Sequence, residues 1–490
     1  MYHDTDTIAA ISTAMNNSGI GIIRISGDDA FRILGDIFRP ANPKKDMTQV
    51  SGHTIHYGYI MNGTDIVDEV LVMVMKAPHT YTREDTVEIN CHGGMFVMQR
   101  VLELVLSSGA RTAQPGEFTK RAFLNGRIDL TQAEAVIDVI NAENDFALES
   151  AVTQLKGSVS DIIRAKRGIL LEQIAFIEAA LDDPEHYELD HYGEELFPVI
   201  RDLKEDVEEL IRTADDGRIL KEGIRTVILG KPNVGKSSLL NALLGMDRAI
   251  VTQIPGTTRD ALEENIRMGD LTLHMIDTAG IRETEDVIEK IGVDKAREYA
   301  QKADLILWVI DQSRPLDEDD REIAGIIAGK KAVILMNKQD LAPVLEKEEI
   351  REMLRSYGKT ILDIGSEMVL NKPKTAPERN ILQNKIPVID ISAKNNTGME
   401  QLRNILRYMF YNKEINFNDQ VYITNMRQKE SLKAAANSLQ KAMESIRMGM
   451  PEDFYTIDLM DAYTSLGSVI GEAVEDDLAD EIFSRFCMGK

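Results

Sequence analysis

The spacing of apolar and polar residues changes several times along this chain of 490 residues. In residues 1–125, short apolar runs such as 20–25 and 70–75 are separated by turn residues, and one helical pattern lies near residues 95–106. Apolar runs of this length between turn signals predict β-strands. We therefore predict an α+β domain in this part of the chain.

A helical period follows. In residues 131–181, apolar residues recur every three or four positions, and glycine and proline become rare. This period predicts long amphipathic helices. A further helix is predicted at 194–213, the Asp-Asp-Gly sequence at 215–217 is predicted to form a hinge, and helical spacing returns at 425–486.

Between the two helical parts, residues 224–409 alternate strand-like apolar runs with helical patterns. Such alternation predicts a parallel sheet covered by helices. The expected fold class is multidomain, with an α/β domain inserted into a helical domain, although two separate helical domains would fit the same pattern. The predicted domains are residues 1–125 (α+β), 126–217 and 413–490 (helical) and 218–412 (α/β).

One polar stretch, residues 341–384, is longer than the usual connections of an α/β domain. It includes the sequence Asn-Lys-Pro-Lys-Thr-Ala-Pro, which is typical of a loop. We expect disorder or a peripheral insertion there.

The charge balance bears on the choice of partner. The chain has 56 basic and 81 acidic residues, a net charge of −25. Such a chain repels a polyanion on average, so RNA binding would need a basic patch or a partner protein. The acidity could equally serve solubility alone.

No apolar run reaches the ~18 residues of a membrane span, and the acidic N-terminus is unlike a signal peptide. With only two cysteines, these features predict a cytoplasmic protein without a membrane segment.

Residues 230–237 read Gly-Lys-Pro-Asn-Val-Gly-Lys-Ser, which matches the G-x-x-x-x-G-K-S phosphate-binding pattern. The pattern follows an apolar run and precedes a helical one, as a phosphate loop requires. In such a loop, backbone N–H groups surround phosphate oxygens. Lys236 would pair with the β- and γ-phosphates, and Ser237 would offer its hydroxyl to Mg²⁺. A chance glycine-rich turn is the alternative, and the full pattern in this context disfavours it.

Two further elements predict guanine as the base. Asn337, Lys338 and Asp340 form an N-K-x-D pattern after an apolar strand. The carboxylate of Asp340 would accept hydrogen bonds from guanine N1–H and N2–H₂, a donor pair that adenine lacks on that edge. Ser392 and Ala393, after another apolar strand, fit the loop that supports the base.

The γ-phosphate should be sensed by two switch segments. Asp277 and Gly280 form a D-x-x-G pattern, and Thr257 and Thr258 precede it. Such segments become ordered with triphosphate and are released on hydrolysis. These elements, in this order, resemble the translation-factor-related branch of small GTPase domains.

Ile281 follows Gly280, where many GTPases carry a glutamine that orients the attacking water. An aliphatic side chain cannot do so. Another group must therefore position the water, and another positive charge must replace an arginine finger. Asn233, inside the phosphate loop, could hold a monovalent cation against the phosphates.

The last five residues, Phe-Cys-Met-Gly-Lys, resemble the F-C-x-G-K terminus of the MnmE (TrmE) family of tRNA-modification GTPases. Residues 21–27, 87–94 and 115–127 resemble the N-terminal domain of that family, and residues 254–260 resemble its switch. The resemblance spans essentially the whole chain. The chain departs from the family at residues 13–18, at Arg83 in place of a glycine, and in the long segment before Ile386. The first two departures lie in the part of the chain where the family binds a one-carbon folate, and they therefore bear on that implied site.

The resemblance implies GTP, Mg²⁺, K⁺ and a one-carbon tetrahydrofolate derivative as ligands. It places Mg²⁺ at Ser237 and Thr258, with Glu289 positioning the water. It places K⁺ at Asn233, Thr252, Ile254 and Thr257. The implied folate contacts are Arg24, Glu88, Arg127 and Lys490. The nucleotide and cation contacts that it implies are Asn233, Val234, Gly235, Lys236, Ser237, Ser238, Thr252, Gln253, Ile254, Pro255, Gly256, Thr257, Thr258, Asp277, Thr278, Ala279, Gly280, Asn337, Lys338, Asp340, Ser392 and Ala393.

The family's activity is then expected: K⁺-stimulated GTP hydrolysis that drives modification of the wobble uridine of certain tRNAs. With a MnmG-like flavoprotein, an aminomethyl or carboxymethylaminomethyl group would be added at carbon 5. The resemblance implies a homodimer whose N-terminal domains bind folate, with tRNA held mainly through the partner. It leaves Cys487 as either a nucleophile or a structural residue.

Two other functions are considered. A ribosome-assembly GTPase would bind RNA directly, but residues 471–477 are acidic where a basic appendage would be expected. The second alternative is a folate-dependent transferase whose GTP-binding α/β domain is only regulatory.

Overall fold

The computed structural model describes residues 6–47, 49–142, 144–183, 185–186, 189, 191–246, 264–269, 271–276, 293–364, 384–411, 422–472, 482–483, 486 and 489. It forms two compact units. The first comprises Met1–Ile140, Ala151–Glu208 and Arg427–Lys490, and the second comprises Asn141–Ser150 and Glu209–Met426. Most of the second unit is thus inserted in the sequence of the first. No helix in the described part of the chain is both long and apolar enough to span a membrane.

The first unit begins with a seven-stranded sheet in the order β3-β4-β5-β6-β2-β1-β7. Its elements are β1 (Ile8–Ile11), β2 (Ile20–Ser26), α1 (Ala30–Ile37), β3 (Phe38–Pro40), β4 (Thr54–Asn62), β5 (Asp65–Met75), β6 (Thr86–His92), α2 (Met95–Ser107), β7 (Arg111–Thr112) and α3 (Glu117–Leu124). Alternate strand residues such as Ile23, Val72 and Ile89 join Ile33 of α1 and Met98 of α2 in one buried core. The predicted α+β architecture is confirmed.

The strand residues that alternate with this core point the other way, and several of them are large and apolar. Ile55, Tyr57 and Leu71 have exposed fractions of 61%, 46% and 48%. The pairing register sets Tyr57 beside Leu71 on adjacent strands. One face of the sheet is therefore covered by α1 and α2. The other face is open and partly apolar over β4 and β5, whereas at β1 Phe118 of α3 packs on Ile8 and Ala10.

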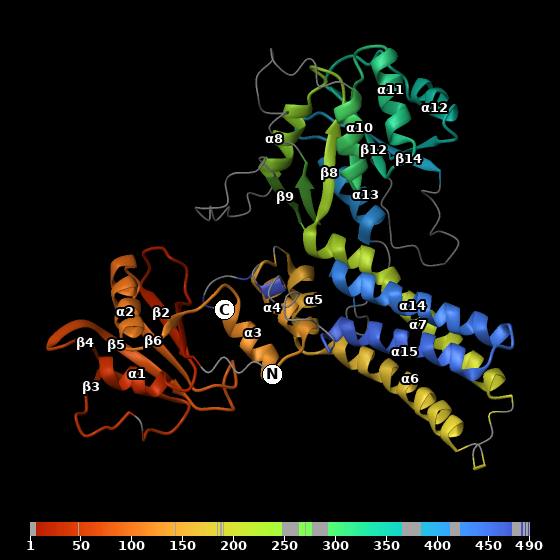
Figure 1. Ribbon diagram of the computed structural model, residues 1–490. Coiled ribbons are helices and arrows are strands. Elements are labelled where there is room, and N and C mark those ends of the chain that lie inside the picture. Colours follow the sequence, from red (N-terminus) through yellow and green to blue (C-terminus); the bar gives the residue numbers. More distant parts are fainter. Residues whose placement is uncertain are drawn as a thin grey trace. The chain divides into compact units, whose positions relative to one another are not determined.

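The rest of the first unit is helical, as predicted (Figure 1). The helices that contribute to it are α4 (Leu130–Ile140), α5 (Asp145–Leu155), α6 (Ser158–Asp182), α7 (Tyr192–Glu222), α14 (Met426–Arg447) and α15 (Glu452–Ile470). The buried residues of α6 and α14 recur every three or four positions, which is the stripe that packs helices together. The predicted helical run to residue 486 is interrupted, because Gly471 ends α15 with a φ of 89°, in the left-handed region.

The hinge predicted at residues 215–217 is wrong. Helix α7 continues through these residues to Glu222. Gly217 lies inside the helix, where a Cβ atom would lie 2.3 Å from the carbonyl oxygen of Ile423. Glycine is needed here because another chain segment approaches closely, and the sequence alone cannot distinguish that need from a turn.

The second unit contains another seven-stranded sheet, in the order β13-β14-β12-β11-β8-β10-β9. Its elements are β8 (Ile224–Leu229), α8 (Lys236–Met246), β9 (Glu264–Met268), β10 (Leu271–Met275), α10 (Val293–Lys302), β11 (Leu305–Asp311), α11 (Glu318–Ile327), β12 (Ala332–Asn337), α12 (Lys347–Arg355), β13 (Thr360–Asp363), β14 (Lys385–Asp390) and α13 (Met399–Tyr411). All pairings are parallel except that of β9 with β10. Two apolar clusters hold the residues from alternate positions of the strands, so the predicted parallel α/β domain is confirmed.

Of the two expectations for residues 341–384, disorder is wrong for the first half of the stretch, which forms regular structure at the edge of the sheet. Helix α12 and strand β13 lie within it, and β13 pairs with β14 at the sheet edge. Ile350, Met353 and Leu354 of α12 stand at helical spacing and pack into the core, with Ile350 and Leu354 fully buried. The polar average of the whole stretch hid this short apolar stripe. Residues 365–383 lie outside the described part of the chain.

Candidate functional site

The phosphate loop occupies the connection between β8 and α8, at the carboxyl end of a central strand. Three of its residues have left-handed φ values: Gly230 at 150°, Asn233 at 61° and Gly235 at 101°. The two glycines are sterically required. A Cβ atom on Gly230 would lie 2.5 Å from the Val309 carbonyl oxygen, and one on Gly235 would lie 2.2 Å from Nδ2 of Asn337. The loop is thus tightly folded against its neighbours, with Asn233, Ser237 and Ser238 exposed.

Lys236 lies in the first turn of α8 and reaches back over this loop. Its Nζ donates hydrogen bonds to the carbonyl oxygens of Gly230 and Lys231, at 2.7 and 2.8 Å. Burial lowers the pKa of the ammonium group. A partly desolvated cation beside N–H groups at a helix N-terminus suits a multiply charged anion.

Asn337 joins the phosphate loop to the loop that follows β14. Its Nδ2 donates to the carbonyl oxygen of Val234 at 2.8 Å, and its Oδ1 accepts from the backbone N–H of Ala393 at 3.0 Å. The side chain is 3% exposed. The first residue of the predicted N-K-x-D element therefore holds the phosphate-binding and base-binding loops together.

Asp340 is exposed at the end of the same loop, and the buried Ser392 orients it. The Ser392 hydroxyl donates to Oδ1 of Asp340 at 2.7 Å. This bond, together with a backbone N–H, holds the pKa of Asp340 below its ordinary value. The carboxylate is thus ionised and held in place as an acceptor, which is what recognition of guanine donors requires.

Asp311 is a site residue that the sequence reading missed. It is 4% exposed at the end of β11 and pairs in register with Asn337 on β12. Its Oδ2 accepts from Nζ of Lys338 at 2.6 Å, and Lys338 has a left-handed φ of 66°. The sequence offered one indication of its role, which was its position. An aspartate at the end of an otherwise apolar strand lies at the carboxyl edge of a parallel sheet, where ligands bind.

The predicted switch residues cannot be placed. Residues 252–258, 277–281 and Glu289 lie outside the described part of the chain, as do Cys487 and Lys490. The phosphate loop and the two base loops are brought together as the sequence predicted.

A second group of predicted residues meets on the face of the N-terminal sheet opposite α1 and α2, beside Phe118 of α3. Arg24 of β2 and Glu88 of β6 are register partners. Nε and Nη2 of Arg24 lie 2.8 and 2.7 Å from Oε1 of Glu88. Their side chains are only 19% and 15% exposed. Both contacts use Oε1, so the pair fixes the orientation of the carboxylate.

An aromatic ring and another arginine lie beside this pair. The guanidinium carbons of Arg24 and Arg127 lie 5.5 and 4.8 Å from the centroid of the Tyr81 ring. The carbonyl oxygen of Gly489 accepts from Nη1 of Arg24 at 3.2 Å. We call Arg24, Tyr81, Glu88, Arg127 and Gly489 the N-terminal polar site. It brings together three of the four predicted folate contacts; the fourth, Lys490, follows Gly489 directly.

Arg83 has a left-handed φ of 61°, a conformation that glycine adopts without strain. Its Nη1 donates to the Asn125 carbonyl oxygen at 2.8 Å, and Asn125 Nδ2 donates to the Thr82 carbonyl oxygen at 2.7 Å. These bonds tie together the two loops that carry Tyr81 and Arg127. The departure at Arg83 is thus accommodated in the loop beside the N-terminal polar site.

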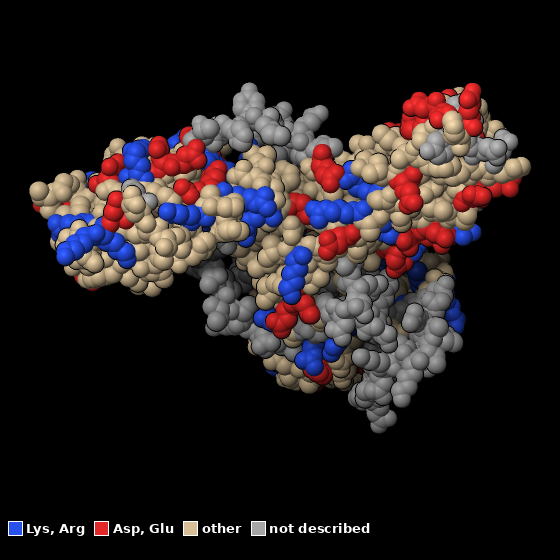
Figure 2. All heavy atoms as spheres, turned by 90° about the horizontal axis from the view of Figure 1, so that it is seen from below, with Lys and Arg blue, Asp and Glu red and all other residues tan. Residues whose placement is uncertain are grey.

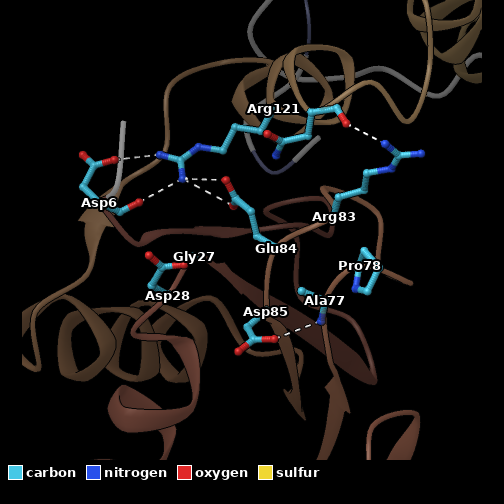
Figure 3. A pocket seen from close by; sticks show the side chains of 10 residues that line it. Asp6, Gly27, Asp28, Ala77, Pro78, Arg83, Glu84, Asp85 and Arg121 are labelled. Carbon is cyan, nitrogen blue, oxygen red and sulfur yellow. Dashed lines mark hydrogen bonds and ion pairs between the residues drawn. The ribbon is translucent and has the colours of Figure 1, made fainter. Parts of the chain in front are cut away.

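A hollow of about 420 Å³ also opens in the N-terminal domain (Figure 3). Arg121 reaches into it and contacts Asp6 at 2.7 Å and Glu84 at 3.2 Å, while Asp85 accepts from the Ala77 backbone N–H at 2.9 Å. These polar groups join Asp6, the loop before β6 and helix α3 to one another. Their contacts therefore give them a structural role. The residues lining the hollow are Asp6, Gly27, Asp28, Ala77, Pro78, Arg83, Glu84, Asp85, Arg121 and Asn125.

Comparison with known proteins agrees with this geometry. The family description "GTP-binding protein TrmE N-terminus" matches residues 7–127, and "MnmE helical domain" matches residues 130–487. The tRNA modification GTPase MnmE of Lachnoclostridium phytofermentans is 51% identical over 487 residues, covering 99% of this chain and all of that protein. Those of Acetivibrio thermocellus and Thermoanaerobacter pseudethanolicus are 46% and 44% identical over 492 and 487 residues, covering 100% and 99% of both chains. With its phosphate and base loops in place and this identity along its length, the chain belongs to the MnmE family of tRNA modification GTPases.

Proposed function

We propose that this GTPase is stimulated by K⁺, requires Mg²⁺, and acts with a MnmG-like flavoprotein on the wobble uridine of certain tRNAs. The group added at carbon 5 would be aminomethyl or carboxymethylaminomethyl, with its one-carbon unit from a folate. The observation that most supports this is the N-terminal polar site, far in sequence from the nucleotide loops. A simple GTP switch would need only the loops.

In the nucleotide domain, formed by β8–α13, the chain's own residues bind and orient GTP. Lys236, which bonds to loop carbonyls, would turn its ammonium hydrogens to the β- and γ-phosphates. Asp340, oriented by Ser392, would accept from the guanine edge. Glu289 is proposed to orient the attacking water, since Ile281 has no polar atom to do so.

Two cations complete this proposal. Mg²⁺ would be held by Ser237 and Thr258, and it would neutralise charge on the β- and γ-phosphates. K⁺ would be held by Asn233, whose side chain is exposed in the phosphate loop, with Thr252, Ile254 and Thr257. It would supply the positive charge that an arginine finger supplies in other GTPases. Hydrolysis is expected to be faster in K⁺ than in Na⁺ at equal ionic strength, and equal rates would exclude the K⁺ site.

The N-terminal polar site suits a folate chemically. Glu88, held through Oε1, keeps a second carboxylate oxygen able to accept from the pterin's amino group and ring N–H. Tyr81 offers a ring face for stacking, and Arg127 is exposed and can pair with the carboxylates of the glutamyl tail. Lys490 would add a further cation beside Gly489.

The open part of the same sheet, over β4 and β5, supports the proposed homodimer. Ile55, Tyr57 and Leu71 are more apolar and more exposed than a solvated strand face needs. A second copy of this face would bury them, so Leu71→Lys is expected to weaken the dimer in light scattering. If this variant forms dimers over the same concentration range as the wild type, the interface lies elsewhere.

Recognition of tRNA is proposed to depend on the flavoprotein partner. The net charge is −25, and in the view of Figure 2 basic and acidic side chains are interspersed, without a continuous basic strip among the described residues on that face. A polyanion therefore gains little from this face alone.

The deciding experiment is mass analysis of wobble uridines in tRNA from cells lacking this protein. Loss of the modified nucleoside is expected, with restoration by the wild-type gene but not by Lys236→Ala or Arg24→Ala. Unchanged nucleosides would refute the proposal. Full modification by an Asp277→Ala variant would instead favour a transferase whose GTPase is only regulatory. Normal modification by Cys487→Ser would exclude nucleophilic catalysis by that thiol.

A further inference from the structure

Lys231 follows the first glycine of the phosphate loop, at a position that the G-x-x-x-x-G-K-S pattern leaves open. Its side chain is 17% exposed, and its ammonium group contacts two carboxylates at the start of α11. Nζ lies 2.7 Å from Oδ2 of Asp317 and 2.6 Å from Oδ2 of Asp320. The ammonium group is thus bound to the protein itself, which favours a role through the loop rather than on the phosphates.

The two carboxylates are themselves held in place by the first turn of α11. Oδ1 of Asp317 accepts from the Asp320 backbone N–H at 3.4 Å, and Oδ2 of Asp320 accepts from the Asp317 backbone N–H at 3.1 Å. This reciprocal pair is a capping box, which satisfies backbone donors at a helix start. The side chain of Asp320 is 2% exposed, and a buried carboxylate needs a cation beside it. Lys231 supplies that cation from the phosphate loop.

The backbone of Lys231 holds the phosphate-binding lysine. The carbonyl oxygens of Gly230 and Lys231 accept hydrogen bonds from Nζ of Lys236, and Gly230 lies against the Val309 carbonyl oxygen. These two carbonyls set where the Lys236 ammonium group lies in the loop. Because the Lys231 side chain is fixed to α11, the position of both carbonyls depends on the ion pairs of Lys231.

The connection between β11 and α11 also holds the base loop. At its start, Oδ2 of Asp311 accepts from Nζ of Lys338 at 2.6 Å, and the Gln312 backbone N–H donates to the Asn337 carbonyl oxygen at 3.1 Å. This short connection therefore binds a lysine of the base loop at its start and a lysine of the phosphate loop at its end. It sets the spacing of two loops that must contact the same nucleotide.

We propose that Lys231 is a positioning residue, which fixes the phosphate loop to the start of α11 and thereby sets the affinity for GDP and GTP. Without its ion pairs, the carbonyls of Gly230 and Lys231 are free to shift, and the Lys236 ammonium group shifts with them. Reordering the loop then costs binding free energy. The loop contacts the phosphates before and during hydrolysis, so KM should rise while kcat changes little.

Titration with a fluorescent GDP analogue and steady-state GTP hydrolysis, both on the full chain, test this. Lys231→Met keeps the apolar stem and removes the charge. Kd for GDP and KM for GTP are each expected to rise about tenfold, the scale of one lost charge-assisted hydrogen bond, while kcat stays within about threefold of wild type. Lys231→Arg keeps the charge and can pair with both carboxylates, so its Kd should stay within about threefold of wild type.

Asp320→Asn completes a double-mutant cycle, because the amide keeps an acceptor for the Asp317 N–H but carries no charge. Its Kd for GDP should rise at least about threefold. The double variant with Lys231→Met and Asp320→Asn should bind GDP no more weakly than Lys231→Met alone. Residues that act as one pair are not additive, and the double change also removes the unpaired buried carboxylate.

The matched control is Arg321→Ala, which removes a cation from the same helix. Arg321 pairs with Glu318 at 3.3 Å, and both side chains are well exposed, at 67% and 80%. An exposed pair of this kind contributes little, so Kd and KM should stay within about twofold of wild type. Circular dichroism and thermal unfolding, recorded in parallel, identify the variants that fold.

The proposal is overturned if a folded Lys231→Met variant binds GDP within about threefold of the wild-type Kd, or if its loss is confined to kcat. If that variant does not fold, a folded Asp320→Asn variant with the wild-type Kd overturns it instead. It is also overturned if the losses of the two single variants multiply in the double variant, because the two residues would then act independently.

Discussion

Replacing Asn337 with alanine should uncouple the phosphate loop from the base loop. The change removes a donor to the Val234 carbonyl and an acceptor from the Ala393 N–H, both buried contacts. Each backbone group left without a partner costs about 1–3 kcal/mol. In the absence of nucleotide the two loops can move so that water reaches these backbone groups, which lowers the cost. We therefore take the lower part of that range, about 2–4 kcal/mol for the two groups together.

Guanine nucleotides require both loops in place, so most of this cost should be measured as lost affinity. An energy of about 2–4 kcal/mol corresponds to a Kd raised roughly 30- to 1,000-fold. Titration with a fluorescent GDP analogue measures the change, with thermal unfolding recorded in parallel. Asn337→Asp keeps the acceptor for Ala393 but faces the Val234 carbonyl with an anion, so it should lose at least half as much binding energy.

Gln339→Ala is the matched control in the same loop. Gln339 is exposed, and its structural contact is a backbone bond to the Ile391 carbonyl oxygen. Its Kd should stay within about twofold of wild type, the usual range for a surface change. A folded Asn337→Ala variant whose Kd rises less than about threefold would refute the bridging role.

Three further predictions follow from particular contacts. Asp340→Asn should shift nucleotide preference from GTP toward XTP, because the amide can donate to the extra carbonyl of xanthine; competition binding measures this, and an unchanged preference would contradict the assignment of Asp340. Burial opposes ionisation of Asp304, but hydrogen bonds from Arg218 and Arg225 outweigh it and lower the pKa below its ordinary value of 3.8. The stabilisation is therefore present above that value and lost as pH falls through the lower folded pKa. Asp304→Asn should consequently flatten the acid limb of the stability curve, and an unaltered limb would argue against the ion pair. Gly217→Ala should destabilise by about 1–3 kcal/mol through overpacking against Ile423, whereas Gly168→Ala in α6, where a Cβ atom meets open space, should stabilise by up to ~1 kcal/mol; equal effects in denaturant unfolding would refute the contact argument.

The amino-acid sequence determined the local chemistry of this protein. The phosphate loop, the N-K-x-D element and the alternation of strands and helices depend on residues close together in the chain, where spacing and side-chain type suffice. The predicted preference for guanine depended on one carboxylate, that of Asp340 in the N-K-x-D pattern. The family resemblance also identified Arg24, Glu88 and Arg127, but their residue types alone would have suggested surface charges.

The tertiary structure decided what depends on contact between distant segments. Arg24 meets Gly489 across 465 positions of sequence, and Asn337 joins two loops that flank different strands. Gly217 reads as a turn residue until the approach of Ile423 shows why it lies within a helix. In each case the deciding energy is packing or a hydrogen bond with a partner far along the chain, and local spacing carries no record of that partner.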